Sequence, residues 1–424
     1  MMRATMWRTG ALIAVLAIVL GACNSSGATT SPAASVASQA PAASETAAPA
    51  ESTAPSEAAV ESATCEGATP NEFFDLEECN KQLRLRSVTP EGPDGQPWLQ
   101  YLEPDFVDTA KWKHDGPAKV CFSNASISNP WRVTGHITML QTIEQQKAAG
   151  KISEFVEIDA GGDDNKQISD ISQLLSQGCD ALIISPNTTA ALTPAVEQAC
   201  ATGIPVIDFD RGVNTDCPVT FIKSIGGYAY GADGAEFLAA NVKKGGNIIS
   251  IRILPGVDVL ETRWLAAEAI FKQAGLNVVS SQFTQGDPAE TKKIVADALE
   301  QGTIDGVWMD AGATSVGAIE AFEDAGLPVP PIAGEDQQDF LMKWQDESLT
   351  AIAPNYSNFM WRTAVMATVM ILNGEQVPAH WNLPQPAITQ ATLAQSIDRT
   401  LPPLHYASCG CSDLPGYPDA WKNR

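Results

Sequence analysis

The stretch CDALIISPNTTAALTPAVEQACATGIPVIDFDR, residues 179–211, contains two short apolar runs with an amphipathic segment between them. The runs at 181–185 and 205–208 have the length of strands and are rich in branched aliphatic side chains. The segment 192–201 has helical spacing and ends shortly before Gly203, a residue type that commonly follows a helix end. A strand, a helix and a second strand in this order predict a βαβ unit, whose parallel strands are covered by helices.

The same alternation continues on both sides of this unit. Toward the N-terminus it predicts strands at 119–122 and 154–159, and helices at 131–149 and 166–177. Toward the C-terminus it predicts helices at 230–242, 263–274, 289–301 and 315–325, and strands at 247–251, 278–282, 306–309 and 331–333. The order predicts an α/β fold with two similar lobes. A strand at 349–353 and a helix at 358–372 then remain, so we expect the chain to return to the first lobe.

The first 23 residues have the layout of a secretory signal. Arg3 and Arg8 supply positive charge, residues 11–20 are apolar, and small residues precede Cys23. The apolar run is shorter than the roughly 20 residues that a bilayer-spanning helix needs. The ending Leu-Gly-Ala-Cys resembles the lipoprotein box of bacteria. This resemblance implies a signal peptide at 1–22, cleavage before Cys23, and lipid on Cys23 as the membrane anchor.

Residues 23–64 have the composition of a disordered tether. They are almost only Ala, Ser, Pro, Thr, Glu, Val, Gln and Gly, without an aromatic residue, and cannot bury enough apolar surface to offset the entropy of ordering. About 40 residues of flexible coil would average roughly 35 Å from end to end. We therefore expect an extracytoplasmic body, in the periplasm or at the cell surface, that stays close to the membrane.

Size and charge limit the partners of this body. The chain has 424 residues and is 44% hydrophobic, and the part after the tether is long enough for two domains. The formal net charge is −24, or about −26 once Arg3 and Arg8 leave with the signal. Because an acidic surface repels phosphate backbones, we expect no nucleic-acid partner.

Nine cysteines become eight if Cys23 carries lipid, and an even number in an exported chain favours disulfides. The sequence alone does not fix the pairing. A bridge between Cys200 and Cys217 would close a loop and contribute about 3 kcal/mol in the chain-entropy model. Cys121 and Cys179 lie at the starts of two strands that should be neighbours, and they are either bridged or buried free thiols. The remaining four cysteines could staple the two tails together, and they are Cys65, Cys79, Cys409 and Cys411.

Four segments in order carry a family resemblance that runs from about residue 117 to 390. They are FSNASISNPWR (122–132), QGCDALIISPNTTAAL (177–192), GIPVIDFDR (203–211) and the predicted helix that opens with Arg263. The chain resembles the ribose-type periplasmic sugar-binding proteins of ABC transporters. The resemblance implies two Rossmann-like lobes of periplasmic binding protein type I with three hinge crossings, near 223–225, 354–356 and 384–387.

The domain layout that this resemblance implies has six parts. A signal peptide occupies 1–22, a tether 23–64 and an N-terminal extension 65–115. The first lobe comprises 116–223 plus 355–384, and the second lobe comprises 224–354 plus 385–400. A cysteine-containing tail occupies 401–424.

Candidate ligand-binding residues of the first lobe follow its predicted strands, where ligands bind in open α/β sheets. The resemblance assigns Ser123, Asn124, Asn129, Trp131, Arg132, Asp210 and Arg211. Trp131 offers an aromatic face for a sugar ring. Asp210 accepts and Arg211 donates hydrogen bonds, so the pair can hold vicinal hydroxyls.

The second lobe is expected to contribute Arg263, Asp310 and Asp336, and Asn355 stands where the family places an amide near the hinge. Asp310 is included because Ala311 stands where the family commonly has an asparagine. Other departures concern the ligand. Gly286 replaces the second-lobe aromatic residue of a ribose binder, and the Asn-Pro-Trp-Arg segment is closer to the galactofuranose-binding branch, which favours a furanose or another small polyol-like ligand.

The function implied is capture of a monosaccharide or a similar small polyhydroxylated ligand by hinge closure, followed by delivery to an ABC permease. It implies a monomer with no catalytic residues and no cofactor. We also expect no metal, because the histidines lack metal-ligand spacing. The histidines are His114, His136, His380 and His405.

Two alternatives stay open. The same fold permits a sensory sugar or autoinducer receptor that signals to a membrane partner. A secreted glycoside hydrolase would need two carboxylates at a set separation. The acidic pairs Asp163-Asp164 and Glu335-Asp336 could supply them, although solvated loops account for such pairs in an acidic chain.

Overall fold

The computed structural model describes residues 64–422, except for the side chain of Ala313. The predicted signal peptide, Cys23 and all but the last residue of the predicted tether lie outside the described residues. Among the described residues, no helix is both long and apolar enough to cross a membrane.

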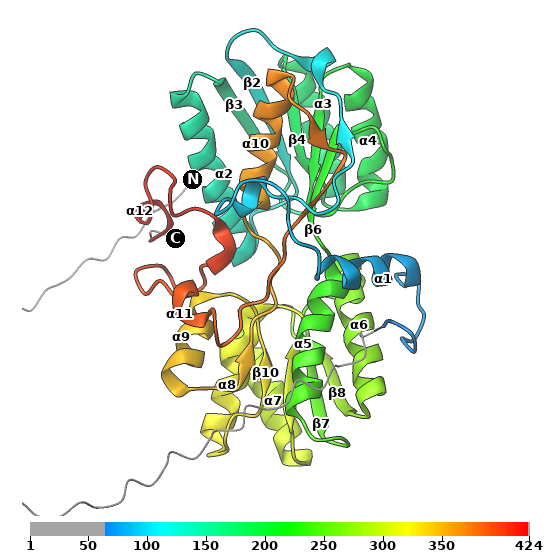
Figure 1. Cartoon of the computed structure of the whole chain (residues 1–424), viewed down its shortest axis with the longest axis vertical. Coiled ribbons are helices and arrows are strands. Elements are labelled where there is room, and N and C mark those ends of the chain that lie inside the picture. Colours follow the sequence, from blue (N-terminus) through cyan, green and yellow to red (C-terminus); the bar gives the residue numbers. More distant parts are fainter. Residues whose placement is uncertain (1–63, 423–424) are drawn as a thin grey trace, which may run out of the picture. The chain divides into compact units, whose positions relative to one another are not determined.

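The first lobe is built on a sheet of six parallel strands in the order β13-β6-β5-β4-β2-β3. The strands are β2 (Ala118–Asn124), β3 (Ile152–Asp159), β4 (Ala181–Ser185), β5 (Val206–Phe209), β6 (Thr220–Ser224) and β13 (His380–Leu383). Its helices are α2 (Pro130–Ala148), α3 (Asp164–Ser176), α4 (Thr189–Ala201) and α10 (Met360–Asn373). Figure 1 shows α2 and α10 on one face and α3 and α4 on the other.

Alternating side chains of the strands explain why both faces are covered. In β2, Val120 and Phe122 pack with α2 and α10, whereas Cys121 points into the cluster formed with α3 and α4. Successive residues of a strand point to opposite faces, so a run that is apolar at every position needs helices on both sides. The short apolar runs of the sequence are therefore buried central strands.

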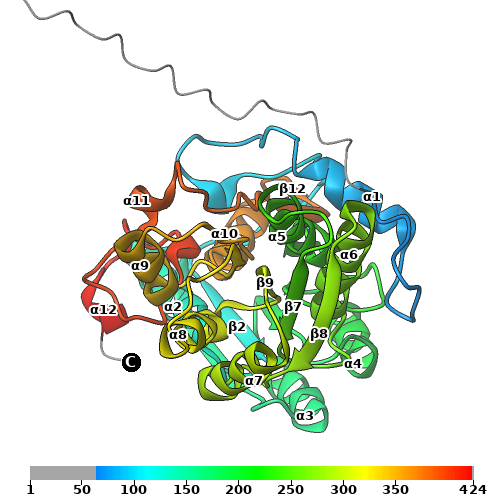
Figure 2. The same cartoon turned by 90° about the horizontal axis from the view of Figure 1, so that it is seen from below.

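The second lobe has five parallel strands in the order β11-β10-β9-β7-β8. The strands are β7 (Asn247–Arg252), β8 (Asn277–Phe283), β9 (Gly306–Met309), β10 (Ile332–Ala333) and β11 (Ala351–Ile352). The helices are α5 (Gly227–Asn241), α6 (Asp258–Ala274), α7 (Pro288–Gln301), α8 (Ser315–Asp324) and α9 (Gln338–Glu347). Figure 2 shows α5 and α6 on the opposite side of the sheet from α7 and α8. The predicted α/β class with two parallel-sheet lobes is confirmed.

Some elements differ from the prediction. Helix α6 begins at Asp258 and not at Arg263, so Arg263 lies in its second turn. The prediction lacked α9, β6 and β13 as separate elements, because each is a short run that mixes apolar and polar residues. Helix α10 packs in the core of the first lobe, since Trp361 and Ala364 lie in the cluster with Phe122.

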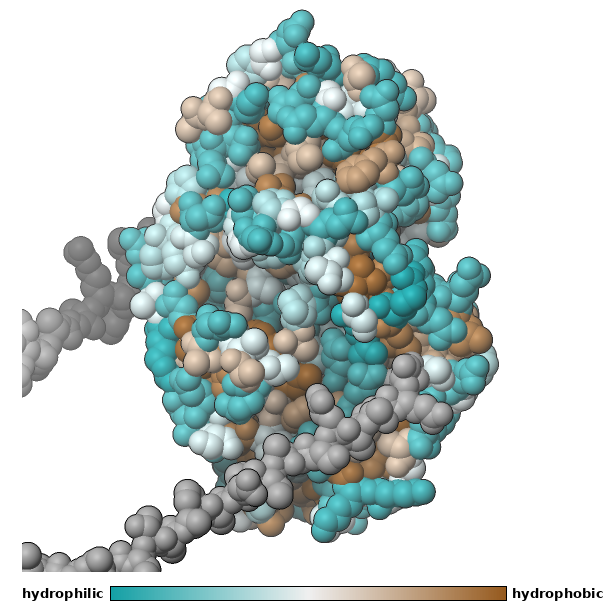
Figure 3. All heavy atoms as spheres, in the orientation of Figure 1, coloured by the Kyte–Doolittle hydropathy of each residue, from teal (hydrophilic) through white to brown (hydrophobic). Residues whose placement is uncertain are grey.

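Terminal segments add short elements to both lobes. Helix α1 (Leu76–Leu85) packs on α5, and β1 (Phe106–Val107) pairs with β12 (Val377–Pro378). The other short elements are α11 (Leu393–Ser396), α12 (Asp419–Lys422) and the 3-10 turns Pro97–Leu99, Ala110–Trp112, Gly312–Thr314 and Ala407–Cys409. Figure 3 shows that hydrophilic residues cover most of one face.

The eight described cysteines form four disulfides, Cys65–Cys79, Cys121–Cys179, Cys200–Cys217 and Cys409–Cys411. The pairing that the sequence left open includes a bridge between Cys200 and Cys217 and another between Cys121 and Cys179. The idea that cysteines staple the two tails together is wrong. Each tail closes its own disulfide, because the first packs beside α5 and α6 whereas the last packs with Trp421.

Three chain crossings between the lobes are hydrogen-bonded to one another. The side chain of Gln385 accepts a bond from the Gly226 N–H at 3.0 Å and donates to its carbonyl at 3.3 Å. Ser357 donates its backbone N–H to Ser224 Oγ at 2.8 Å and its hydroxyl to the Pro384 carbonyl at 2.6 Å. Residues near 224–226, 357 and 384–385 therefore form one connected hinge region.

Close packing inside the first lobe gives a stability prediction. A Cβ on Gly135, in the middle of α2, would overlap the indole ring of Trp361. Alanine is favoured over glycine in a helix by about 1 kcal/mol, whereas overpacking a core costs about 1–3 kcal/mol. We expect Gly135→Ala to lower the free energy of unfolding, measured by denaturant titration.

Gly302→Ala is the matched control, because its added Cβ would meet nothing within 4 Å and its φ of 164° is extended. We expect this control to leave stability unchanged or slightly higher. A Gly135→Ala protein as stable as the wild type would contradict the packing described for α2 and α10.

Candidate functional site

Polar side chains meet at the carboxyl ends of the first-lobe strands. Arg132, in the first turn of α2, contacts the Asp210 carboxylate at 2.5 Å with one nitrogen. Its other terminal nitrogen lies 3.3 Å from Ser185 Oγ and 3.5 Å from Asn124 Oδ1. Both side chains of the ion pair are almost fully buried. Removing one partner of such a pair leaves an uncompensated buried charge, so the two residues must act together.

Local chain geometry places this pair. Asn129 is the N-cap of α2, and its side chain accepts the backbone N–H of Arg132 at 2.9 Å, with Pro130 at the first helical position. Asp210 follows β5 with a φ of 78°, which is unusual for a residue other than glycine. Strained backbone of this kind clusters at functional sites.

Other first-lobe candidates have partners within the protein. Ser123 is buried and lies 3.3 Å from the Gln167 amide, and Asn124 donates to Asp159 at 2.8 Å. Arg211 is partly exposed and donates to the Asn187 carbonyl. The structure thus brings Asn124, Arg132 and Asp210 together, keeps Arg211 beside them, and gives Asn129 a capping contact.

Arg263 lies among aromatic and acidic groups of the second lobe, and Asp310 is the predicted candidate beside it. Its guanidinium lies 3.8 Å from the ring centre of Tyr230 and 5.3 Å from that of Tyr356. It donates to the Asp310 carbonyl, and Glu335 lies 3.7 Å away. Burial alone would lower the pKa of Arg263, but the neighbouring tyrosines and carboxylates outweigh it and raise the pKa.

Three buried carboxyl groups accompany this one guanidinium. Burial raises the pKa of Asp310 to about 7, against the opposing effect of Arg263. The pKa of Asp336 is also raised to about 7, by burial and by the nearby Glu335. Glu335 itself has a raised pKa because of burial, partly offset by Arg263. The site therefore holds carboxyl groups that exchange protons near neutral pH.

Several acceptor atoms here lack a hydrogen bond of normal geometry within residues 64–422. They are both carboxylate oxygens of Asp310, Oδ1 of Asp336 and Oδ1 of Asn355. Asn355 also places its amide 3.5 Å from the Pro386 carbonyl, at the hinge. An unpaired buried acceptor costs free energy, so these atoms can hold the donors of a ligand.

Sequence reasoning missed Tyr356, the residue next to Asn355. Its carbonyl accepts the indole N–H of Trp131 at 3.0 Å, and its hydroxyl lies 3.5 Å from the Asp210 carbonyl. The Trp131 ring is 5.7 Å from the Tyr356 ring and 5.9 Å from Trp361. Because Arg263 also lies beside the Tyr356 ring, this one residue contacts both groups of candidates.

Sequence reasoning also missed the contribution of the C-terminal tail. The Ser408 N–H donates to Asp336 Oδ2 at 2.8 Å, and the Tyr406 hydroxyl donates to Glu335 at 3.0 Å. Asp336 is therefore partly occupied by the protein itself. No repeat or helical period in the tail signals these contacts, although an aromatic residue between prolines and cysteines could have marked an ordered segment.

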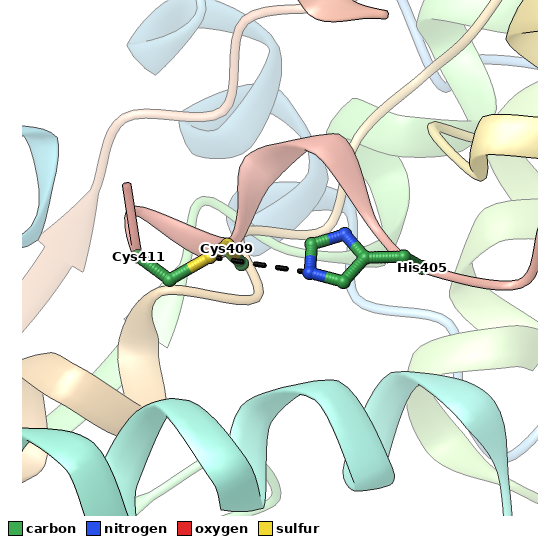
Figure 4. Close-up of side chains that lie close together, drawn as sticks. All are labelled: His405, Cys409 and Cys411. Carbon is green, nitrogen blue, oxygen red and sulfur yellow. Dashed lines mark hydrogen bonds between the residues drawn. A yellow bond between two sulfur atoms is a disulfide. The ribbon is translucent and has the colours of Figure 1, made fainter. Parts of the chain in front are cut away.

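The tail also contains a group with metal-ligating residue types. His405, Cys409 and Cys411 place their ligand atoms within 4.8 Å of one another, and Figure 4 shows the imidazole pointing at the sulfurs. Cys409 and Cys411 are joined in a disulfide, and the His405 ring lies 3.9 Å from Cys411 Sγ. Cysteine binds a metal as a thiolate, and the disulfide between Cys409 and Cys411 does not offer one.

The raised pKa of Asp310 gives a prediction of pH dependence. The Asp310 carboxyl binds its proton more tightly in the folded state than in the unfolded state, where its pKa lies near 3.8. The free energy of unfolding therefore decreases as the pH rises from about 4 through 7. Asp310→Asn removes this decrease in the free energy of unfolding, because an amide does not lose a proton in this pH range. We expect the variant to be more stable than the wild type at pH 8, by up to about 4 kcal/mol, and we expect this difference to shrink as the pH falls and to vanish below about pH 4.

Thermal unfolding of both proteins across this pH range measures the difference. Asp419→Asn is the control, because Asp419 is exposed and its ion pair within the described residues is with Lys422 on the surface. Melting curves of wild type and Asp310→Asn that shift in parallel from pH 5 to 8 would contradict the described environment of Asp310.

Comparison with known proteins agrees with this architecture. The family model of the periplasmic binding protein domain matches residues 120–376, which is more than half of the chain. The ribose import binding protein of Bacillus subtilis is 27% identical over 269 residues, which cover 63% of this chain and 86% of that protein.

Two solved structures share the fold. An ABC transporter solute binding protein from Thermobispora bispora gives a TM-score of 0.61 at 24% identity, over 68% of this chain and 90% of that one. Another, from Bacillus halodurans and with bound myo-inositol, gives 0.58 at 22% identity, over 66% and 98%. The two parallel-sheet lobes and the family match together show that the chain belongs to the periplasmic binding protein family, with the type I fold.

Proposed function

We propose that this protein is an extracytoplasmic solute-binding protein that captures one small polyhydroxylated molecule, such as a monosaccharide, between its lobes. The observation that carries the proposal is the meeting of two sets of buried polar groups at Tyr356, which touches Trp131 and Asp210 on one side and Arg263 on the other. A ligand held there would be desolvated, and each of its hydrogen bonds would gain weight in the lower dielectric.

The chemistry of the groups fits hydroxyls, which both donate and accept. Arg211 and Arg263 offer donors, while Asp310, Asp336 and Asn355 have acceptor oxygens that lack a hydrogen bond of normal geometry in the described part of the chain. Hydrogen bonds to charged groups contribute about 1.5–3 kcal/mol each, enough to discriminate between epimers. The ribose import and myo-inositol-bound relatives support a neutral polyol as the ligand class.

Two further parts of the proposal concern transport. The hydrogen-bonded hinge at Ser224, Gly226, Ser357 and Gln385 supports capture by closure of the lobes. The Bacillus subtilis relative is named for ribose import and the Bacillus halodurans protein for an ABC transporter, which supports delivery of the ligand to an ABC permease. We propose that the protein acts as a monomer.

One of the two carboxylate pairs considered for a hydrolase, Asp163-Asp164, has structural partners. Asp163 caps α3 by accepting the Lys166 N–H at 2.9 Å, and Asp164 binds the side chains of Asn187 and Thr188 at 2.8 Å each. Hydrolysis needs two carboxylates that flank a bond, and this pair is committed to a helix start. These contacts support a binder over an enzyme.

A binding screen across pentoses, hexoses, furanoses and polyols tests the proposal. We expect one class to bind with one-to-one stoichiometry in calorimetry and to raise the melting temperature. Recovery of the unchanged ligand is expected. Turnover of a sugar, or no binding in the whole panel, would refute the proposed function.

Asp210→Asn tests the site. The amide keeps the shape of the side chain but removes the charge that faces Arg132, so we expect at least a tenfold weaker affinity for the ligand found in the screen, or about 1.4 kcal/mol. Asp233→Asn is the matched control, because Asp233 is also buried against an arginine, Arg86 at 2.8 Å, but contacts none of the candidate residues. Equal losses in both variants would contradict the site assignment.

We also propose that lipid on Cys23 anchors the mature protein to the cell membrane. The support is the charged, apolar and small-residue order of residues 1–23. We expect Cys23→Ser to move the protein from the membrane fraction to the soluble exported fraction, without changing ligand affinity. A wild-type protein found entirely in the soluble fraction would contradict the anchor.

A further inference from the structure

The segment 401–422, here called the C-terminal strap, is bound to the second lobe along the start of α9. Backbone N–H groups of Gln338 and Asp339 donate to carbonyls of the strap at 2.9 and 2.7 Å. In return, the Ala407 N–H donates to the Asp336 carbonyl at 2.8 Å. Together with the side-chain contact of Tyr406 to Glu335, these bonds fix one end of the strap beside the candidate site.

The same strap is bound to the first lobe a few residues later. Arg362 of α10 donates to the Gly410 carbonyl at 2.5 Å and forms a two-pronged pair with Asp413 at 2.5 and 2.9 Å. Further along, the Trp421 indole lies 3.4 Å from Thr138 of α2. In Figure 1 the red strap accordingly runs from the neighbourhood of α9 to that of α2.

Ser408 is the residue where the two attachments meet. Its N–H donates to the Asp336 carboxylate of the second lobe, and its carbonyl accepts the Phe359 N–H, at the start of α10, at 3.0 Å. One residue therefore contacts both lobes through its own backbone. Any hinge motion that separates Asp336 from Phe359 must break one of these bonds.

The chain around Ser408 is built for close contact. The Cys409–Cys411 disulfide closes a ring that contains Gly410. Gly410 has a φ of 57°, and a Cβ there would come within 2.7 Å of Trp98 and 2.9 Å of Phe359. Only glycine fits this approach without strain. Arg362 stacks on the same Trp98 ring at 3.6 Å, so the strap is seated in an aromatic and cationic socket of the first lobe.

We propose that the C-terminal strap ties the two lobes together across the ligand site, with Tyr406 and Ser408 as positioning residues for Glu335 and Asp336. The strap limits how far the lobes separate without ligand, and it slows release once the ligand is bound. The statement on release rests on the proposed function, whereas the statement on the lobes does not.

Energy transfer between fluorophores on the two lobes tests the tie without any ligand. Dyes are attached at two exposed positions, Ala148→Cys in α2 and Ala296→Cys in α7. The full chain also carries Cys23→Ser, so that Cys23 offers no further thiol, and the eight described cysteines are already paired in disulfides. We expect a narrow distribution of transfer efficiency in this parent protein. Arg362→Ala should broaden the distribution and shift it to a new mean, since it removes the first-lobe anchor of the strap.

Asp413→Asn is the second variant, because Asp413 is half-exposed and its replacement does not disturb the core. Arg399→Ala is the control, since Arg399 forms a similar pair with Asp346, on the second lobe alone and before the strap begins. Near-ultraviolet circular dichroism checks that each variant is folded. Unchanged distributions in folded Arg362→Ala and Asp413→Asn, or an equal change in Arg399→Ala, would overturn the tie.

Stopped-flow release of the sugar found in the screen tests the second part. We expect Arg362→Ala and Asp413→Asn to raise the dissociation rate at least threefold, with the association rate changed less, and Tyr406→Phe to raise it while leaving the energy transfer intact. Unchanged dissociation rates would overturn the role in release. If no sugar binds the wild type, the proposed function fails, while the energy-transfer result still decides whether the strap ties the lobes.

Discussion

Tyr356 joins the two halves of the candidate site, because residues of both halves contact it. Its carbonyl holds Trp131, its hydroxyl reaches the Asp210 backbone, and its ring lies beside the Arg263 guanidinium. The residue stands in the second crossing between the lobes, one position before Ser357 and its hinge hydrogen bonds. The candidate site and the chain crossings between the lobes are thus adjacent in the chain, so the proposed ligand would lie next to the proposed hinge.

Buried charge distinguishes the two halves of the candidate site. In the first lobe, Arg132 and Asp210 satisfy each other. In the second lobe, Arg263 lies near Glu335 and Asp310, and oxygens of Asp310 and Asp336 lack a hydrogen bond of normal geometry in the described part of the chain. Such atoms are costly in a dry interior and become favourable when a ligand supplies hydroxyl donors. The second lobe therefore gains most from a ligand, and the strap supplies part of what it lacks.

The sequence predicts the parallel-sheet lobes well, because βαβ alternation is a local pattern that repeats many times. It also selects Arg132, Asp210, Arg263 and Asp310, whose neighbours in space come from distant strands. It does not tell which polar groups satisfy one another. In the structure, Asn129 caps a helix, Asn124 donates to Asp159, and Asp336 accepts the Ser408 N–H. Tyr356 and the strap act through tertiary contacts that leave no periodic signal, and the tail cysteines paired locally for the same reason.

A crystal structure of the protein with the sugar or polyol that binds best tests the central claim most directly. We predict one intact ligand between the lobes, next to Tyr356. Its hydroxyls should form hydrogen bonds with Asp210 or Arg211 on one side and with Arg263 and Asp310 on the other. A ligand bound outside this region, a ligand that contacts only one lobe, or a cleaved product in its place would contradict the account.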